Sequence, residues 1–259
     1  MAHSVLITQS GSKTDSSFVA DFLPAVVHDL KTPLNAITVF ADLLQEDISG
    51  GKVSQEELLD YVCEIKKAAV DMNELVHDLL DVNSVNSGNF AVDLSKKIVV
   101  GDAIRRAVRV NRDYGLRRGI NIDLIVDPDV SEMKLDEKRI KQIVSNLVSN
   151  ALKYSPSKTT VKVTCKNIAP HPLVADRKPN PEFLEIAVID QGFGMSDSQL
   201  RDIFNKYQTF NNPNSGRVDS LGLGLAIVKQ LVELQNGAIE IISNPNQGTT
   251  VKVRFPYAA

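Results

Sequence analysis

A histidine, a carboxylate and a hydroxyl stand close together near the start of the chain, in HDLKTPL (residues 28–34). A neutral imidazole is a nucleophile, and the carboxylate of Asp29 can hold the proton on one nitrogen of His28 while the other nitrogen attacks. Thr32 follows His28 by four residues, so on a helix the two lie on the same face. This grouping indicates a histidine that accepts a phosphoryl group. The alternative is a surface histidine with ordinary polar neighbours.

A second set of polar residues is spaced for one face of a helix. Asn146, Asn150 and Lys153 stand at positions i, i+4 and i+7 of a predicted helix over residues 136–153. Two amide oxygens and an ammonium group along one line suit a Mg²⁺ ion that bridges phosphates. The alternative is a solvated polar edge of the helix.

Two glycine-rich segments follow in the second half of the chain. Asp190 ends a predicted strand, and Gly192 and Gly194 come directly after it. A carboxylate in that place can accept a hydrogen bond from the exocyclic amine of a base, and the glycines let the backbone approach a flat ring. The run LGLGL (residues 221–225) then opens a predicted helix, whose N-terminus attracts anions. Neither a P-loop nor a complete G-x-G-x-x-G is present, so only the combination of segments predicts a nucleotide site.

His28 falls within a long predicted helix, over residues 18–49, whose apolar residues repeat with heptad spacing. The repeat places His28 at the heptad position farthest from the seam and therefore on the outer face. Pro33 removes one backbone amide and predicts a kink beside it. The seam consists of Leu23, Val26, Leu30, Pro33, Ile37, Phe40 and Leu44.

A second long helix is expected after the glycines at 50–51, and Ser54 and Glu57 predict a capping box at its start. Its seam, in steps of four and three, consists of Leu58, Val62, Ile65, Ala69, Met72, Val76 and Leu79. A single antiparallel hairpin cannot bury both seams. We therefore expect two copies of the chain to form a four-helix bundle, as a homodimer.

The rest of the chain alternates strands and helices. Strands are expected over residues 120–126, 159–164, 183–189, 238–242 and 249–254, and helices over residues 101–118, 136–153 and 225–236. Helices stacked on one face of a mixed sheet form a two-layer α/β sandwich. We expect an α+β protein with a flexible segment over residues 1–17, a dimerising phosphotransfer hairpin over residues 18–88 and a nucleotide-binding catalytic domain over residues 89–259.

The composition is that of a soluble globular protein, since 43% of the 259 residues are hydrophobic, 24% are charged and the net charge is −3. This balance gives no general attraction to nucleic acid, and no apolar run reaches the roughly 18 residues of a membrane-spanning helix. The two cysteines, Cys63 and Cys165, lack metal-site spacing and indicate a reduced, cytoplasmic environment. A natural full-length protein anchored in a membrane would carry its anchor in a further N-terminal region.

Taken together, these segments resemble the sensor histidine kinases of two-component signalling over nearly the whole chain. Residues 28–34 are similar to the phosphoacceptor box of that family, residues 146–155 (NLVSNALKYS) to its asparagine box, and residues 190–195 (DQGFGM) to its first glycine box. Phe204 stands where the phenylalanine box begins, and residues 222–225 (GLGL) match the second glycine box.

The resemblance implies a fold shared with the gyrase, Hsp90 and MutL ATPases, with ATP and Mg²⁺ as ligands. Asn146 and Asn150 would hold Mg²⁺ and phosphate oxygens, and Lys153 would contact phosphate. Asp190 would bind the adenine amine, and Tyr154 would line the adenine site. The further ATP-binding residues that it implies are Gly192, Gly194, Lys206, Gly222, Leu223, Gly224 and Leu225.

Two positions depart from the family pattern. Thr209 stands where the family often carries an arginine that contacts phosphate, and Lys206 or Arg217 is the candidate replacement for that charge. Ser220 stands in a pair of residues that is usually Gly-Thr in the family. Both positions fall in residues 205–221, which are expected to form a mobile lid over ATP, so both bear on how the γ-phosphate is held.

The expected activity is ATP-dependent autophosphorylation of His28, assisted by Asp29, followed by transfer of the phosphoryl group to an aspartate of a response-regulator receiver domain. Thr32 would orient water for dephosphorylation of that regulator, which would add a phosphatase activity. Two alternatives stay open: a degenerate kinase that acts as a binding or phosphatase module, and an ATPase of the same superfamily without histidine chemistry. The His28-Asp29 pair and the hairpin favour the kinase, because an ATPase needs neither.

Overall fold

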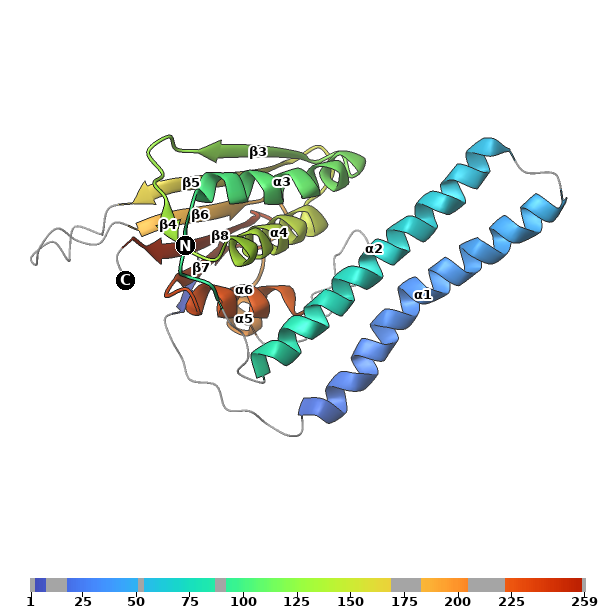
Figure 1. Ribbon diagram of the computed structural model, residues 1–259, viewed down its shortest axis with the longest axis horizontal. Coiled ribbons are helices and arrows are strands. Elements are labelled where there is room, and N and C mark those ends of the chain that lie inside the picture. The colour runs from blue at the N-terminus through green and yellow to red at the C-terminus, as the bar shows by residue number, and fades with distance from the viewer. Residues whose placement is uncertain are drawn as a thin grey trace, which may run out of the picture. The chain divides into compact units, whose positions relative to one another are not determined.

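The computed structural model describes residues 3–7, 18–50, 54–86, 92–168, 183–204 and 222–257. These residues divide into two compact units. One unit holds two long helices, and the other holds the β-sheets with the shorter helices (Figure 1). Among the described residues, none of the helices combines the length and the apolarity that crossing a bilayer requires.

The helical unit is an antiparallel hairpin of α1 (Phe18–Gly50) and α2 (Gln55–Asn86). The predicted capping box is confirmed at the start of α2. The Ser54 backbone N–H donates to Glu57 Oε2 at 2.9 Å, and the Glu57 backbone N–H donates to Ser54 Oγ at 3.2 Å. These bonds satisfy amides that the helix itself leaves without partners, and they keep the pKa of Glu57 below its usual value.

The expected seam of α1 is confirmed where its side chains are described. Leu30, Pro33, Ile37, Phe40 and Leu44 are half-buried, and most positions between them are exposed. The helix continues through the proline without interruption. The side chains at 23 and 26 lie outside the described part of the chain.

Alternate residues of the expected seam of α2 are exposed in the single chain, and their burial by a second copy stays a prediction. The side chain at 79 lies outside the described part of the chain. Val62, Ala69 and Val76 are exposed, and the partly or fully buried apolar positions are Leu58, Tyr61, Ile65, Ala68, Met72 and Leu75. The ring centroids of Tyr61 and Phe40 are 6.1 Å apart, which shows that Tyr61 faces α1. The cause is that α2 carries two adjacent apolar stripes. A periodicity argument cannot decide which of the two meets α1.

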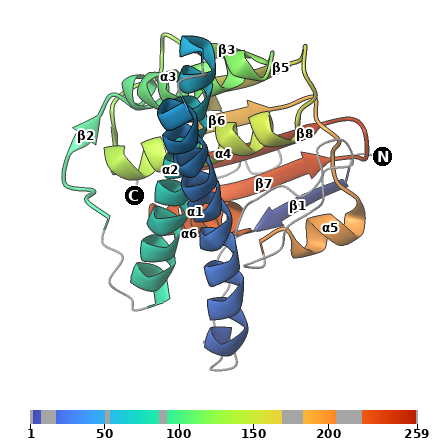
Figure 2. The same cartoon turned by 90° about the vertical axis from the view of Figure 1, so that its right-hand side faces the viewer.

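The second unit is built on a mixed six-stranded sheet (Figures 1 and 2). Only β3 and β5 pair in parallel, and the remaining neighbours are antiparallel. The strand order across the sheet is β1 (His3–Ile7), β7 (Ala238–Ser243), β8 (Thr249–Pro256), β6 (Phe183–Ile189), β5 (Thr160–Ile168) and β3 (Asn121–Val126). A separate two-stranded sheet pairs β2 (Lys97–Ile98) with β4 (Met133–Lys134).

Three helices cover one face of this sheet: α3 (Val100–Arg117), α4 (Glu137–Tyr154) and α6 (Gly224–Glu233). A short helix, α5 (Asp197–Asp202), lies beside β1. The core fills the space between the helices and the sheet, and its fully buried side chains include Ile140 and Ile143 of α4 and Phe255 of β8. Each such side chain contributes about 1.5–3 kcal/mol by leaving water, so the core fixes α4 against the sheet.

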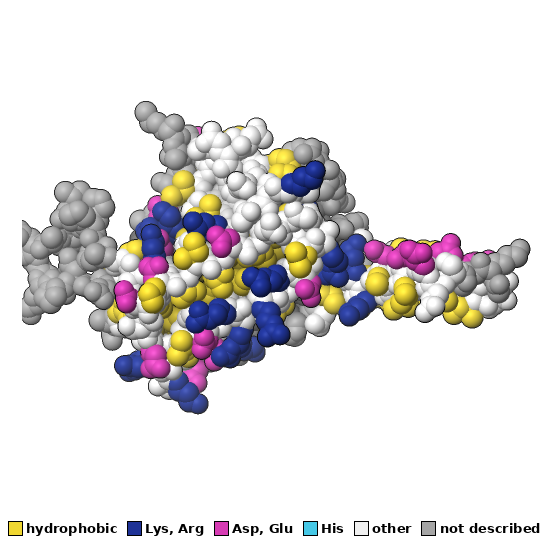
Figure 3. Space-filling model, turned by 90° about the horizontal axis from the view of Figure 1, so that it is seen from above, with side chains coloured by type: hydrophobic (Ala, Val, Ile, Leu, Met, Phe, Trp, Pro, Cys, Tyr) yellow, Lys and Arg dark blue, Asp and Glu magenta, His cyan; other side chains and the backbone are white. Residues whose placement is uncertain are grey.

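The outer side of α3 is rich in arginine, and Figure 3 shows Lys and Arg side chains gathered on the face of the second unit seen from above. Arg106 pairs with Glu137 at 2.8 Å, and the buried Asn111 donates to Ser145 Oγ at 3.0 Å. Both contacts join α3 to α4, so α3 helps to hold α4 in place.

The expected flexibility of residues 1–17 is wrong for His3–Ile7, which form β1 and pair with β7. The physical reason is the apolar, strand-forming run VLI (residues 5–7) beside an open sheet edge. Residues 8–17 lie outside the described part of the chain. The other expected strands and helices are present with bounds shifted by a few residues, whereas β2, β4 and α5 were not foreseen.

Candidate functional site

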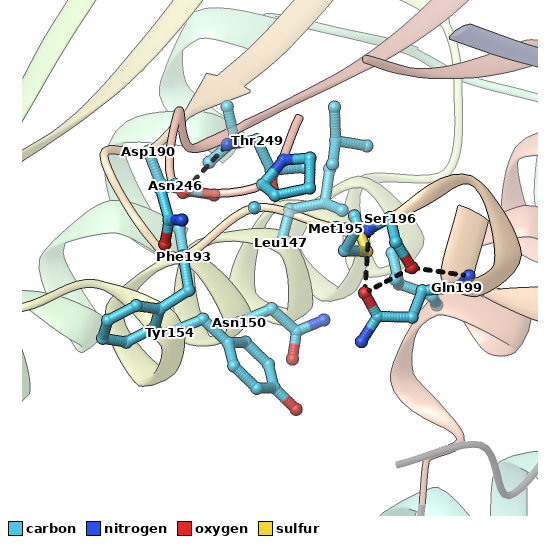
Figure 4. Close-up of a pocket in the computed structure, with 16 residues that line it drawn as sticks. Leu147, Asn150, Tyr154, Asp190, Phe193, Met195, Ser196, Gln199, Asn246 and Thr249 are labelled. Carbon is cyan, nitrogen blue, oxygen red and sulfur yellow. Dashed lines mark hydrogen bonds between the residues drawn. The ribbon is translucent and has the colours of Figure 1, made fainter. Parts of the chain in front are cut away.

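A cavity of about 300 Å³ opens between α4, the end of β6 and the turn that joins β7 to β8 (Figure 4). Apolar and polar side chains both line it. The lining consists of Leu147, Asn150, Ala151, Tyr154, Val188, Asp190, Phe193, Gly194, Met195, Ser196, Gln199, Leu225, Pro245, Asn246, Thr249 and Val251.

α4 supplies the floor of the cavity. Its N-cap, Asp136, accepts a hydrogen bond from the Arg139 backbone N–H at 3.1 Å and so begins the helix at a defined residue. Leu147, Asn150 and Ala151 of this helix all line the cavity. The apolar residues that recur along α4 pack one face of the helix against the core. Their packing fixes the rotation of the helix and so places the Asn150 side chain in the cavity wall.

Asp190 follows directly after β6 and is the half-buried carboxylate of the cavity. Its Oδ1 accepts hydrogen bonds from the backbone N–H groups of Gly192 at 2.8 Å and Thr249 at 3.0 Å. Burial raises the pKa of Asp190 to about 6, and the two amide donors keep it from rising further. Within the described residues no hydrogen bond reaches Oδ2, so this oxygen can accept one from a ligand.

Two glycines shape the turn around this carboxylate. Gly194 has φ of +63°, and a Cβ there would collide with the Asn244 carbonyl. Gly248 has φ of +77°, and a Cβ there would collide with the carbonyl of Asp190. At both positions two backbone segments lie closer together than a Cβ atom would allow. The β7–β8 turn can therefore pack directly against the end of β6.

Several residues expected at the site from the sequence line this cavity: Asn150, Tyr154, Asp190, Gly194 and Leu225. Two more glycines lie beside it. Gly192 bonds to Asp190, and Gly224, the first residue of α6, lies near the Asn150 side chain, since a Cβ added there would be 3.7 Å from Asn150 Nδ2.

The remaining expected residues do not line the cavity. Asn146 and Lys153 lie on α4 and are half-buried, and Asn146 Nδ2 is buried without a hydrogen-bond partner among the described residues. Gly222, with φ of +63°, and the buried Leu223 precede α6. Lys206 lies outside the described residues, as do positions 209, 217 and 220.

His28, Asp29 and Thr32 belong to α1, in the helical unit. Thr32 is exposed. The side chains of His28 and Asp29 lie outside the described part of the chain, so their heptad placement stays a prediction.

Sequence reasoning missed the wall formed by α5 and the turn before it. Ser196 caps α5, since its Oγ accepts from the Gln199 backbone N–H while Gln199 Oε1 accepts from the Ser196 backbone N–H at 2.8 Å. Both residues line the cavity together with Met195 and Asn246. The spacing Ser-x-x-Gln was a usable signal for the cap, and Asn-Pro-Asn at 244–246 was one for the turn.

The described residues contain no group of three or more His, Cys, Asp or Glu side chains that could hold a metal ion. A cation near this cavity would therefore take amide oxygens from α4 and further oxygens from a bound ligand. Mg²⁺ prefers oxygen ligands and is commonly bound with few protein side chains plus substrate phosphates, so Asn146 and Asn150 fit that ion.

Two family matches cover most of the chain. Residues 19–88 match the His Kinase A (phospho-acceptor) domain, and residues 135–259 match the histidine kinase-, DNA gyrase B- and HSP90-like ATPase domain. The first match contains most of the hairpin and the second contains the cavity. Fold and site together thus define a phosphoacceptor hairpin joined to an ATP-binding domain.

Known relatives agree with this class. The histidine protein kinase DivJ of Caulobacter vibrioides is 31% identical over 238 residues, 92% of this chain and 37% of DivJ. The non-motile and phage-resistance protein of the same bacterium is 27% identical over 248 residues, 96% of this chain and 28% of that protein. The chain spans well under half the length of either relative. The crystal structure of full-length ShkA in complex with AMPPNP has the same fold, with a TM-score of 0.59 and 23% identity over 92% of this chain and 46% of ShkA. The chain belongs to the sensor histidine kinases.

Proposed function

We propose that this chain is an ATP-dependent protein histidine kinase that phosphorylates its own His28 and passes the phosphoryl group to an aspartate of a response-regulator receiver domain. One observation carries the proposal: a single chain joins a phosphoacceptor hairpin that contains His28 to a cavity with a half-buried carboxylate, Asp190, at a strand end. An ATPase without histidine chemistry would need the cavity but not the hairpin.

The apolar part of the cavity suits an adenine ring. Val188 and Ala151 offer apolar walls, and Tyr154 and Phe193 offer aromatic ones. Asp190 Oδ1 is engaged by two backbone amides, so Oδ2 is the acceptor for the exocyclic amine. A donor at that oxygen favours the charged carboxylate, so nucleotide binding would lower the pKa of Asp190 from about 6. Gly192 and Gly194 let the turn approach the ring.

The phosphates would lie along α4 toward the start of α6. Asn146 Nδ2 is a buried donor without a partner in the described residues, and a phosphate oxygen would satisfy it. We assign the amide oxygens of Asn146 and Asn150 to Mg²⁺, which neutralises phosphate charge when bound. Lys153 adds a positive charge on α4. The backbone from Gly222 through Leu223, Gly224 and Leu225 would offer amide donors to phosphate oxygens.

The reacting nitrogen of His28 would attack the γ-phosphorus of ATP, forming a P–N bond while the bond to the β,γ-bridging oxygen breaks and ADP leaves. The carboxylate of Asp29 would hold the proton on the second imidazole nitrogen and stabilise the cation that develops. The P–N bond of phosphohistidine would then break as a receiver-domain carboxylate takes the phosphoryl group. We assign to Thr32, which is exposed, the orientation of water that dephosphorylates the regulator.

The proposed kinase is a homodimer through the hairpin. Val62, Ala69 and Val76 recur every seven residues on α2 and remain exposed, and apolar side chains are visible on the surface of the hairpin in Figure 3. On α1, Val27, Leu34 and Ile48 fall in a second stripe of the same period and are also exposed. A second hairpin would cover both stripes and complete a four-helix bundle.

Labelling with γ-³²P-ATP tests the proposal. We expect acid-labile label on the wild-type protein, its loss in His28→Gln, and its retention in His77→Gln, a matched control on α2. A receiver domain added afterwards would take up the label. ATP turnover that is unchanged by His28→Gln would indicate the ATPase instead. ATP binding without any labelling would indicate a degenerate kinase, an outcome that Thr209 in place of the family's arginine makes worth testing.

A further inference from the structure

The outermost strand of the large sheet, β1, reaches it from a different part of the chain than its neighbours. Five consecutive residue pairs join β1 to β7 antiparallel, from His3 with Ser243 to Ile7 with Ile239 (Figure 2). Every other strand of this sheet follows the hairpin in the sequence, whereas β1 precedes it. β1 is therefore an added strand on a sheet whose remaining strands come from one continuous part of the chain.

The edge of β7 is chemically suited to accept a strand. Its sequence, AIEIIS, has no proline or lysine, and Ile239 is buried. Its one charged residue, Glu240, is bound by Arg254 at 2.6 Å and does not leave a free charge at the edge. The opposite edge strand, β3, exposes Asn121 and Asp123. Unprotected, apolar edges pair with other strands, and here β1 supplies the cover.

Two contacts connect this added strand to the cavity wall. β1 adjoins α5, and Gln199 of α5 and its N-cap Ser196 line the cavity. Ser243, opposite His3 in the register, is buried and its Oγ accepts a hydrogen bond from the Met195 backbone N–H at 3.0 Å. Since Met195 also lines the cavity, the β7 residue that pairs with His3 holds this part of the wall, and β1 itself adjoins α5.

We propose that residues 3–7 are a detachable strand that positions the α5 wall of the cavity. Docked on β7, the strand holds α5 and the backbone at Met195 in place; undocked, it leaves both less ordered and weakens ligand binding. This reading of the cavity as a nucleotide site rests on the proposed function. Ordering five residues opposes the gain from their backbone hydrogen bonds, so the net free energy of docking is small. Residues 8–17 connect the strand to the start of α1.

Hydrogen exchange of the full chain without nucleotide tests the docking. Val5→Pro removes a backbone donor from β1, and Val5→Thr keeps both the donor and the strand propensity as a matched control. We expect Val5→Pro to speed exchange in β7 and in α5 by about tenfold, with β5 unchanged as a control for the fold. ATP affinity, measured by calorimetry with Mg²⁺, should fall several-fold. A synthetic peptide of residues 1–9 should restore both quantities in the proline variant.

Each outcome decides the proposal. Unchanged exchange in β7 would show that the strand does not dock, and faster exchange in β7 with unchanged α5 would show that it does not position the wall. Faster exchange throughout, without rescue by the peptide, would also overturn it. If the wild-type protein fails to bind ATP, the proposed function is wrong, but the exchange of α5 with and without peptide still decides whether the strand supports that wall.

Discussion

At the scale of single residues, the position of Asp190 lowers the stability of the fold but provides a hydrogen-bond acceptor for a ligand. Its carboxylate is half-buried, two backbone amides donate to one oxygen, and the loss of solvent raises the pKa from 3.8 to about 6. A raised pKa means that the folded protein holds the proton more tightly than the unfolded chain does. The cost of burying the charge is therefore full above pH 6 and disappears below the unfolded value.

Replacing the carboxylate of Asp190 should change stability and ATP binding in opposite directions. We expect Asp190→Asn to raise the free energy of unfolding at pH 7.5 by at most about 3 kcal/mol, the equivalent of the raised pKa, with a smaller gain at pH 5. We expect ATP affinity to fall at least about tenfold, because a hydrogen bond to a charged acceptor is lost. Urea unfolding at the two pH values and calorimetry measure these changes. An equal gain in stability at both pH values would contradict the assigned titration.

At the scale of elements, local capping defines where the hairpin's second helix begins. Ser54 and Glu57 satisfy each other's backbone donors, and Ser54 Oγ also donates to Glu57 Oε2 at 2.8 Å. Ser49, in the last turn of α1, instead donates back to the Gln45 carbonyl at 2.7 Å, which a helix does not require.

The two serines therefore predict opposite effects of the same substitution. We expect Ser54→Ala to lower the free energy of unfolding of the hairpin by about 1 kcal/mol, the usual contribution of an N-cap. Ser49→Ala should leave it unchanged or slightly higher, because alanine has the greater helix propensity. Denaturation followed by circular dichroism measures both. Equal losses in the two variants would show that the cap contributes nothing specific.

At the scale of the whole molecule, the hairpin and the sheet unit differ in how completely they bury their apolar side chains. The sheet unit encloses a core of fully buried residues, among them Val253 and Phe255. The hairpin leaves apolar side chains in water on both helices, with 47% of Leu34 on α1 and 48% of Val62 on α2 exposed. Surface of this kind marks an interface.

The dimer can be tested with two valines of nearly equal exposure. Val62 belongs to the second stripe of α2, whereas Val70 lies on another side of the same helix. We expect Val62→Lys to weaken the dimer by on the order of tenfold or more, because a charge would be buried at the interface, and Val70→Lys to leave it unchanged. Light scattering over a dilution series gives the association state. Equal effects of both variants would place the interface elsewhere.

Local patterns in the sequence were enough to predict both long helices, the capping box, the central strands and the residues around Asp190 and Asn150. These features depend on contacts between residues close in sequence, or on periodicity that a buried face imposes. The spacing of the asparagines on α4 predicted their common face for the same reason. Once one stripe of the helix faces the core, the directions of all its remaining side chains follow.

Other features were decided only by tertiary structure. Which stripe of α2 meets α1 depends on the partner helix, because both stripes have the same period. Gln199 and Asn246 are distant in sequence, and they line one cavity only because the β7–β8 turn closes on the segment that follows β6, where the Asn246 backbone N–H donates to the Phe193 carbonyl. The docking of β1 depends on an open edge formed by residues more than 200 positions away. Sequence by itself thus determined the local elements and the candidate chemistry, and long-range packing decided which surfaces those elements share.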